Sequence, residues 1–178
     1  MRAWIGAQTR VVDLHGRFAM PGFNDAHLHL ASAGMAKLTV NFEGTKSLAE
    51  FQQRIRAALK NYRPGEWITG SGWDHTLWAE KRFPTRGDLD AASKDHPMIF
   101  SRVDGHVAVA NSLALKLAGI TKDTADPAGS HIVRDAKTGE PNGMLEEDGA
   151  MHLVYMHVPP PSHELRKRAI ELALADAI

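Results

Sequence analysis

Hydrophobic and polar positions near the start of the chain predict three short strands. Residues 11–14 and 18–20 are apolar, and Gly16 between them is typical of a turn. Residues 23–30 follow the break at Pro21–Gly22 and predict a further strand. The chain is therefore expected to begin in β-structure.

The next apolar pattern has a helical period and predicts one packing face. Ser47 and Glu50 match the capping box that opens many helices. The helix would end at Pro64–Gly65, because proline cannot continue a helix. The apolar positions that recur at helical spacing are Leu48, Phe51, Ile55 and Leu59.

Short apolar runs then alternate with a further helical segment. Residues 67–71 and 98–102 predict buried strands. Residues 112–118 predict a short helix that ends at Gly119. Alternation of strands and helices is typical of α/β proteins.

The last third of the chain predicts an irregular excursion followed by two helices. Residues 123–143 are rich in Asp, Gly, Pro and Lys and predict a hairpin or a surface loop. Residues 144–158 predict a helix that Pro159 stops. The segment from Ser162 onward predicts a final helix with a core-facing stripe of Leu165, Ala169, Ile170 and Leu172.

Composition indicates an ordinary globular protein. The chain has 178 residues, of which 43% are hydrophobic and 24% charged, with zero formal net charge, so we expect no nucleic-acid partner. It shows neither the apolar core of a signal peptide nor a stretch able to span a bilayer, so we expect a cytoplasmic protein without a membrane partner. Cysteine is absent, which leaves His, Asp, Glu or a modified Lys to hold a metal ion.

The first chemical signal is the pair His27 and His29. Side chains two residues apart on a strand point the same way, so both imidazoles would share a face near the strand's C-terminal end. Two imidazoles on one face can hold a zinc ion, although a lone His-x-His pair is more often structural. Asp25 lies on the same face and would accept the second N–H of a metal-bound imidazole.

Five ordered motifs resemble one protein family. The first, at residues 11–14, 20–23, His27 and His29, resembles the segment that opens the catalytic barrel in the amidohydrolase superfamily. The remaining motifs resemble the YtcJ-like, N-substituted formamide deformylase-like branch, amidohydrolase family 3. They are residues 70–74 with Trp78, residues 83–86 with 89–90, residues 102–106 with 111–115, and the run from 126 to 147.

This resemblance implies an α/β fold, namely an incomplete (β/α)8 TIM-barrel metal-dependent hydrolase with part of a small β-domain and an inserted lid-like segment. Residues 1–20 would be the remnant of the N-terminal β-domain, and residues 21–178 a partial barrel with the insertion at about 40–145. A complete barrel takes about 250 residues. We therefore interpret the chain as an N-terminal fragment, whose open strand edges would favour aggregation or need a partner.

The resemblance also implies a centre of one or two divalent metal ions, with Zn²⁺ as the expected ion. His27 and His29 would be its first ligands, and a catalytic zinc normally takes three protein ligands. Glu147 resembles the family's glutamate that approaches the metal. Glu146 competes for this role, and acidic residues at a helix start are also favoured by the helix dipole alone. The remaining ligands and the general base are expected beyond Ile178, so no catalytic residue is assigned within the chain.

A second group of residues resembles the family's substrate-facing lid or wall. His106 would donate a hydrogen bond to a carbonyl or its oxyanion, and the tryptophans would supply aromatic surface. Purely structural roles explain the same residues: a turn at Asp104–Gly105, an ion pair between Arg102 and Asp74, and packed indoles. The assigned substrate-binding residues are Trp73, Asp74, Arg102, Asp104 and His106, with Trp78 beside them.

The function implied is hydrolysis of C–N bonds in small amide or formamide-like substrates by a metal-activated water. An esterase or lactonase-like activity on the same fold is the first alternative. An inactive, truncated or degenerate product is the second. The 178-residue chain alone is expected to be inactive, and a homodimer is expected only of a full-length protein.

Overall fold

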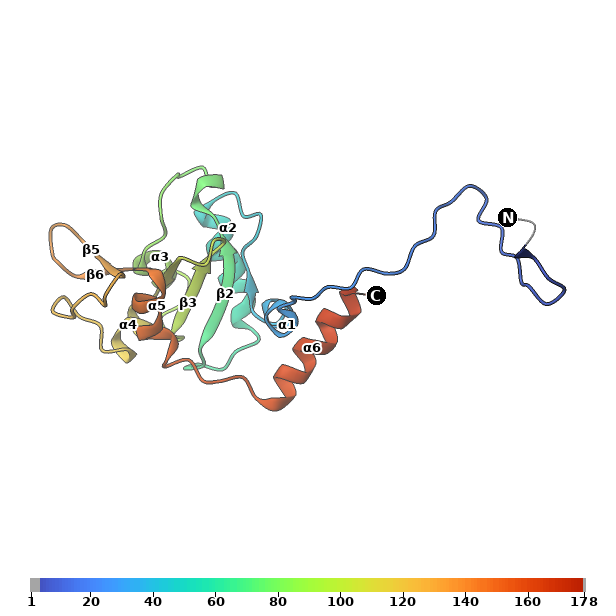
Figure 1. Ribbon diagram of the computed structural model, residues 1–178. Helices are drawn as coiled ribbons and strands as arrows, with labels where there is room; N and C mark the ends of the chain where they lie inside the picture. Colours follow the sequence, from blue (N-terminus) through green and yellow to red (C-terminus); the bar gives the residue numbers. More distant parts are fainter. Residues whose placement is uncertain (1–3, 178) are drawn as a thin grey trace.

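The computed structural model describes residues 4–177, whose centre is a six-stranded mixed sheet (Figure 1). The strand order is β1-β2-β3-β4-β6-β5. The first three strands are parallel, and the remaining neighbours are antiparallel. The strands are β1 (Val40–Asn41), β2 (Ile68–Trp73), β3 (Met98–Arg102), β4 (Val107–Ala110), β5 (His131–Arg134) and β6 (Pro141–Glu146).

Helices lie on both faces of this sheet, with a further helix pair beside it. One hydrophobic cluster lies on the α2 and α3 side, and a second lies on the α4 and α5 side. The helices are α1 (Leu30–Ala36), α2 (Leu48–Leu59), the 3-10 turn η2 (His75–Leu77), α3 (Arg86–Asp90), α4 (Ser112–Leu117), α5 (Glu147–Tyr155) and α6 (His163–Ala177).

An aromatic cluster fills the α2 side. Phe51 is fully buried, and its ring centroid lies 4.4 Å from that of Phe42, 5.3 Å from that of Trp78 and 5.9 Å from that of Phe100. The predicted capping box of α2 forms in part. Ser47 Oγ accepts the Glu50 backbone N–H at 3.1 Å, whereas the Glu50 carboxylate accepts the backbone N–H of Lys46 at 2.8 Å and not that of Ser47. The predicted packing face of α2 therefore lies on the core.

Asn111 joins the other side of the core to the sheet. Its Oδ1 accepts the backbone N–H groups of Met98 and Ala114, both at 3.0 Å, and its amide donates to the carbonyl of His96 at 2.8 Å. The side chain thus caps α4 and ties that helix to β3. Full burial with satisfied hydrogen bonds makes Asn111 a structural residue.

The predicted strands at the start of the chain do not form. Residues 5–29 contain neither helix nor strand, although the turn near Gly16 is present. Phe23 is 93% exposed and Leu28 is 59% exposed. A strand is stable only when a neighbour takes up its backbone hydrogen bonds, and this arm runs away from the body without one (Figure 1).

The later predictions are confirmed in part. The irregular stretch contains the hairpin of β5 and β6, as one of the two alternatives predicted. The helix predicted from residue 144 begins instead at Glu147. Met144 and Leu145 belong to β6, because they pair with Val109 and Ala108 of β4 and are buried there.

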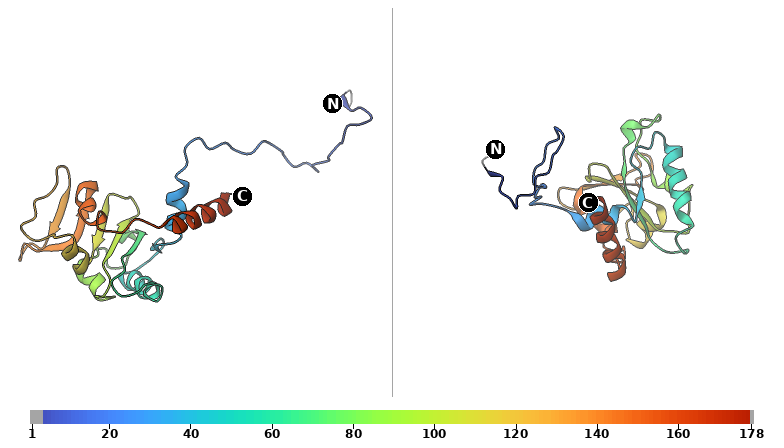
Figure 2. Two further views of the ribbon diagram at one scale, coloured as in Figure 1. Left: turned by 90° about the horizontal axis from the view of Figure 1, so that it is seen from below. Right: turned by 90° about the vertical axis from the view of Figure 1, so that its right-hand side faces the viewer.

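The final helix packs on α1, beside the sheet (Figure 2). The two helices approach so closely that a Cβ on Gly34 would lie 1.9 Å from the carbonyl oxygen of Ala169. Ala169 and Ala173 form the buried stripe of α6, whereas Leu165 and Ile170 are 40% and 39% exposed. The predicted stripe is therefore right at Ala169 and wrong at these two larger residues.

We predict that Phe51→Ala destabilises the chain by about 3–5 kcal/mol, because it leaves a cavity in the aromatic cluster. Urea unfolding followed by tryptophan fluorescence measures the change. Leu77→Ala is the control, because Leu77 is 48% exposed and its truncation should change stability by no more than about 0.5 kcal/mol. Equal losses in the two variants would contradict the assigned core.

Candidate functional site

The candidate site lies at one edge of the sheet, where three strands end. β2, β3 and β6 run in the same direction, since β4 is antiparallel to both β3 and β6. Asp74 follows β2, Arg102 ends β3 and Glu147 follows β6. His106 immediately precedes β4, which begins at this edge. The fold therefore gathers polar side chains from distant parts of the sequence.

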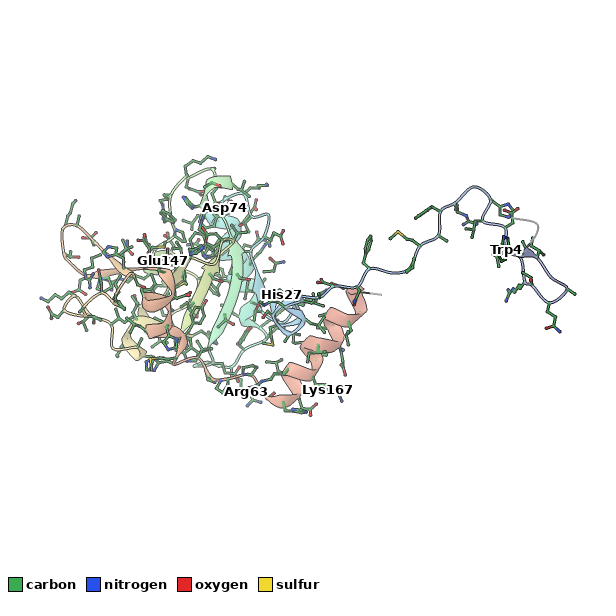
Figure 3. All side chains as sticks on the ribbon, viewed as in Figure 1. Trp4, His27, Arg63, Asp74, Glu147 and Lys167 are labelled. Atoms are coloured by element: carbon green, nitrogen blue, oxygen red, sulfur yellow. The ribbon has the colours of Figure 1, made fainter. Side chains whose placement is uncertain are left out.

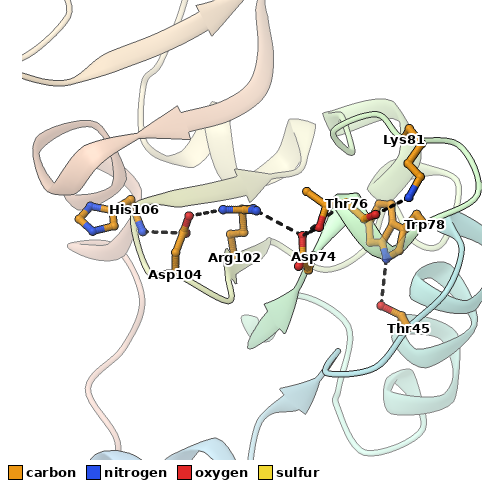
Figure 4. A network of polar contacts seen from close by, with 8 residues as sticks. All are labelled: Thr45, Asp74, Thr76, Trp78, Lys81, Arg102, Asp104 and His106. Atoms are coloured by element: carbon orange, nitrogen blue, oxygen red, sulfur yellow. Dashed lines mark hydrogen bonds and ion pairs between the residues drawn. The ribbon is translucent and has the colours of Figure 1, made fainter.

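Arg102 is engaged by two carboxylates (Figure 4). Its Nη2 donates to Asp74 Oδ1 at 3.2 Å, and its Nη1 forms an ion pair with Asp104. The arginine side chain is only 18% exposed. Thr76 hydrogen bonds, together with Arg102, hold the pKa of Asp74 below its ordinary value. The ion pair anticipated as a structural alternative is therefore present.

His106 and Glu147 are joined twice. The His106 Nδ1 lies 3.1 Å from Glu147 Oε2, and the Glu147 backbone N–H donates to the His106 carbonyl at 2.8 Å. The carboxylate raises the pKa of His106, first through this hydrogen bond and then through its charge. Glu147 has φ +65°, a left-handed conformation uncommon for a non-glycine residue. The backbone is thus bent sharply where β6 gives way to α5.

A cavity of about 360 Å³ opens beside this pair. His131, at the start of β5, lines it and pairs with Asp126 at 2.5 Å. Hydrogen bonding to Arg134, with a further bond from His131, lowers the pKa of Asp126 to about 2. Sequence reasoning missed His131, because its place near Glu146 follows from the β5–β6 register, which no local motif indicates.

The two predicted aromatic contacts are wrong. Trp73 and Trp78 are fully buried. The Trp73 indole N–H donates to the Phe100 carbonyl at 2.8 Å, and that of Trp78 donates to Thr45 Oγ1 at 3.1 Å. Both indoles therefore belong to the core, and neither presents a surface to a substrate.

His27 and His29 lie at the end of the arm, residues 5–29, immediately before α1 (Figure 3). The Nε2 atoms of His27 and His29 are 3.0 Å apart, although no strand forms. Two ligands on one tetrahedral zinc lie about 3.3 Å apart, given bond lengths of about 2.0 Å. The separation is that of a hydrogen bond between the two rings, and it is also close to the spacing of two ligands on one zinc ion. Asp25 accepts the backbone N–H of His27 at 3.0 Å, rather than an imidazole N–H.

The structure does not bring Glu147 to the histidines. Within residues 4–177, no three His, Cys, Asp or Glu side chains form a group suited to a metal ion. Figure 3 shows His27 beside α1 and Glu147 at the start of α5. The absence of strand pairing around His27 explains the separation, because no ladder fixes the arm against the sheet edge.

Comparison with known families decides the broad identity of the chain. The model of the Amidohydrolase family matches residues 10–177. The chain belongs to this family. No helix in the described part of this amidohydrolase chain has the length and apolar character that a membrane crossing requires.

Three curated relatives are similar over most of this amidohydrolase chain. Protein LONG AFTER FAR-RED 3 of Arabidopsis thaliana is 38% identical over 96% of the chain and 29% of its own length. Putative amidohydrolase YtcJ of Bacillus subtilis (strain 168) is 34% identical over 95% and 32%. N-substituted formamide deformylase of Arthrobacter pascens is 34% identical over 84% and 28%. The chain thus spans about a third or less of each relative.

A solved structure supports the same relationship. An uncharacterized metal-dependent hydrolase from Pyrococcus horikoshii OT3 is 31% identical, with a TM-score of 0.59. The match covers 88% of this chain and 29% of the other. The mixed α/β arrangement is therefore shared with part of a larger hydrolase structure.

We predict that Glu147→Gln lowers the pKa of His106, because the hydrogen-bonded Glu147 carboxylate raises that pKa in the unmodified chain. Titration of the imidazole by NMR in the metal-free chain measures the shift. Glu146→Gln is the matched control and should leave the His106 pKa near the wild-type value. An unchanged titration in Glu147→Gln would refute the pairing.

The same pair predicts a pH dependence of stability. The folded-state pKa of His106 is raised, so its contribution to stability is complete below the ordinary histidine pKa. That contribution is lost as the pH rises through the folded-state pKa. Thermal unfolding across this range should therefore show a smaller decline in Glu147→Gln than in wild type, and an equal decline would contradict the assignment.

Proposed function

We propose that this amidohydrolase chain is part of a metal-dependent hydrolase that cleaves C–N bonds in neutral amide or formamide-like substrates. The observation that carries the proposal is the convergence of the His27 and His29 Nε2 atoms to 3.0 Å in a chain of this family. Its relative from Arthrobacter pascens is a formamide deformylase, which supports the choice of bond.

The proposed fold is a (β/α)8 barrel of which this chain supplies part. The support is membership of the Amidohydrolase family. The parallel run β1, α2, β2, α3, β3 lies within residues 40–145, the predicted insertion, and therefore does not bear on the barrel. Catalytic groups of such barrels lie at the carboxyl ends of the strands. Asp74 and Arg102 lie at the carboxyl ends of β2 and β3, two strands of the predicted insertion. The β-domain remnant at residues 1–20 stays a prediction.

His27 and His29 are the proposed metal ligands, with Glu147 as the proposed third. Zinc suits two imidazoles and a carboxylate. When bound, such an ion would lower the pKa of a coordinated water and polarise a carbonyl group. Within the chain, residues are assigned only to holding the ion and orienting the substrate, and none is assigned as the general base.

His106 is the proposed substrate-orienting group. Its Nδ1 carries the proton shared with Glu147, since a carboxylate is only an acceptor when ionised. In the protonated imidazolium, which the raised pKa of His106 favours, Nε2–H is then left to donate to a substrate carbonyl, and the bond to Glu147 fixes the ring before the substrate arrives. A donor held in this way stabilises the charge that develops on the carbonyl oxygen.

We predict that His27→Ala combined with His29→Ala lowers the bound metal of the intact protein at least tenfold, because both proposed ligands are lost. Metal content by mass spectrometry measures this. The matched control is His157→Ala with His163→Ala, which removes two exposed histidines and should retain the metal. Full metal content in the first double variant would reject the ligand assignment.

Activity on the same intact protein tests the bond type. A panel of formamides, amides and lactones should give metal-dependent turnover on the C–N substrates, and His106→Ala should lower it by about 10²–10³. Turnover of lactones alone would favour the esterase or lactonase-like alternative. No turnover on any member would favour a noncatalytic product. The 178-residue chain alone should be inactive, since residues 4–177 do not assemble three ligands.

A further inference from the structure

We propose that Arg102 is a positioning residue, which aligns His106 with Glu147 by clamping Asp104 against the anchored carboxylate of Asp74. The catalytic importance of this alignment rests on the proposed function. The alignment itself is a property of the folded chain and can be measured without metal or substrate.

The Arg102 side chain binds two carboxylates. Arg102 ends β3 and places its guanidinium between Asp74, which follows β2, and Asp104, which lies in the next turn. A planar guanidinium can serve two carboxylates at once from different nitrogens. With both partners engaged and 18% of the side chain exposed, its charge is committed to the protein and does not offer a site for an anionic substrate.

Asp74 is the fixed end of this arrangement. Its Oδ1 accepts the Thr76 backbone N–H at 3.0 Å and the Thr76 hydroxyl at 2.8 Å, which caps η2. These bonds hold the carboxylate independently of Arg102. Arg102 therefore pairs with a carboxylate, that of Asp74, whose position the η2 turn already fixes.

Asp104 connects the Arg102 guanidinium to the backbone of His106. Its Oδ1 accepts the His106 backbone N–H at 3.2 Å. The intervening turn is closed by the Gly105 N–H, which donates to the Arg102 carbonyl at 3.0 Å. Gly105 has φ +78°, a conformation that glycine adopts without strain. Arg102 therefore restrains the His106 backbone through both the turn and the Asp104 side chain.

The last step runs from His106 to Glu147. The His106 carbonyl accepts the Glu147 N–H at 2.8 Å, while the two side chains meet at 3.1 Å. Glu147 holds a left-handed backbone conformation, which persists only where its surroundings enforce it. Release of the turn should thus loosen the Glu147 amide before it affects the strands.

The test is amide hydrogen exchange by NMR on the ¹⁵N-labelled intact protein. We expect Arg102→Gln to accelerate exchange of the Glu147 amide at least tenfold and to shift the His106 amide resonance, with the β3 and β4 amides unchanged. Arg82→Gln is the matched control, because Arg82 makes a two-pronged ion pair with Asp88, a residue outside the chain of contacts from Asp74 to Glu147. It should leave the His106 and Glu147 amides unaffected.

Two further variants keep the test decisive. Arg102→Lys retains the charge but offers one compact ammonium group, so it should also accelerate Glu147 exchange; it replaces Arg102→Gln if that variant does not fold. Asp74→Asn should accelerate Glu147 exchange in wild type and add nothing in the Arg102→Lys background, because its effect passes through the arginine.

Uniform acceleration of all protected amides in the arginine variants would overturn the proposal, because it would indicate a general loss of stability. Unchanged Glu147 exchange, or additive effects of Asp74→Asn and Arg102→Lys, would overturn it as well. These results are independent of hydrolysis. Failure of the intact protein to turn over any substrate would defeat the proposed function and leave the exchange result standing.

Discussion

The alternation of side chains along β3 is the constraint on which both halves of the core depend. Met98 and Phe100 pack into the cluster on the α2 side, while Ile99 points to the opposite cluster. A central strand covered on both faces must be apolar throughout, and β3 is apolar from Met98 to Phe100. Polar side chains can therefore begin only near its end, where Arg102 lies.

This constraint also explains why the polar groups at the sheet edge bind one another. Asp74 and Arg102 are largely shielded from water, with 22% and 18% of their side chains exposed. A charge in that setting is costly unless it is paired, so each supplies the compensation that the other requires. His106 and Glu147 lie farther into solvent, at 69% and 54% exposed, where a substrate or an ion can reach them. This end of the sheet therefore carries a shielded ion pair, Asp74 with Arg102, and an exposed hydrogen-bonded pair, His106 with Glu147.

Sequence reasoning succeeded where local pattern and burial agree. Helix α2 begins after the predicted cap residue Ser47, and β3 has the predicted bounds, because each is specified by its own apolar spacing. It failed at Met144 and Leu145. Their local sequence fits a helix, but both residues pair with β4 in the sheet. The tryptophans failed for a related reason, since a motif shows that Trp73 lies near the site without showing that its indole turns inward. The proximity of His131 to Glu146 arises only from hairpin register.

Strand pairing does not hold the arm that carries His27 and His29 in place, whereas it positions the rest of the candidate site. Asp74, Arg102 and Glu147 are placed by a hydrogen-bonded sheet, whereas residues 5–29 have no strand to pair with. In the described residues, β1 is an edge strand, so one side of Val40–Asn41 remains open to a ladder. A parallel strand beside that edge would end at the same side of the sheet as β2 and β3. Pairing there would place the two imidazoles at the carboxyl-terminal end of the parallel strands. It would also leave them five strand spacings of about 4.8 Å each from β6, so pairing with β1 alone does not bring them to Glu147.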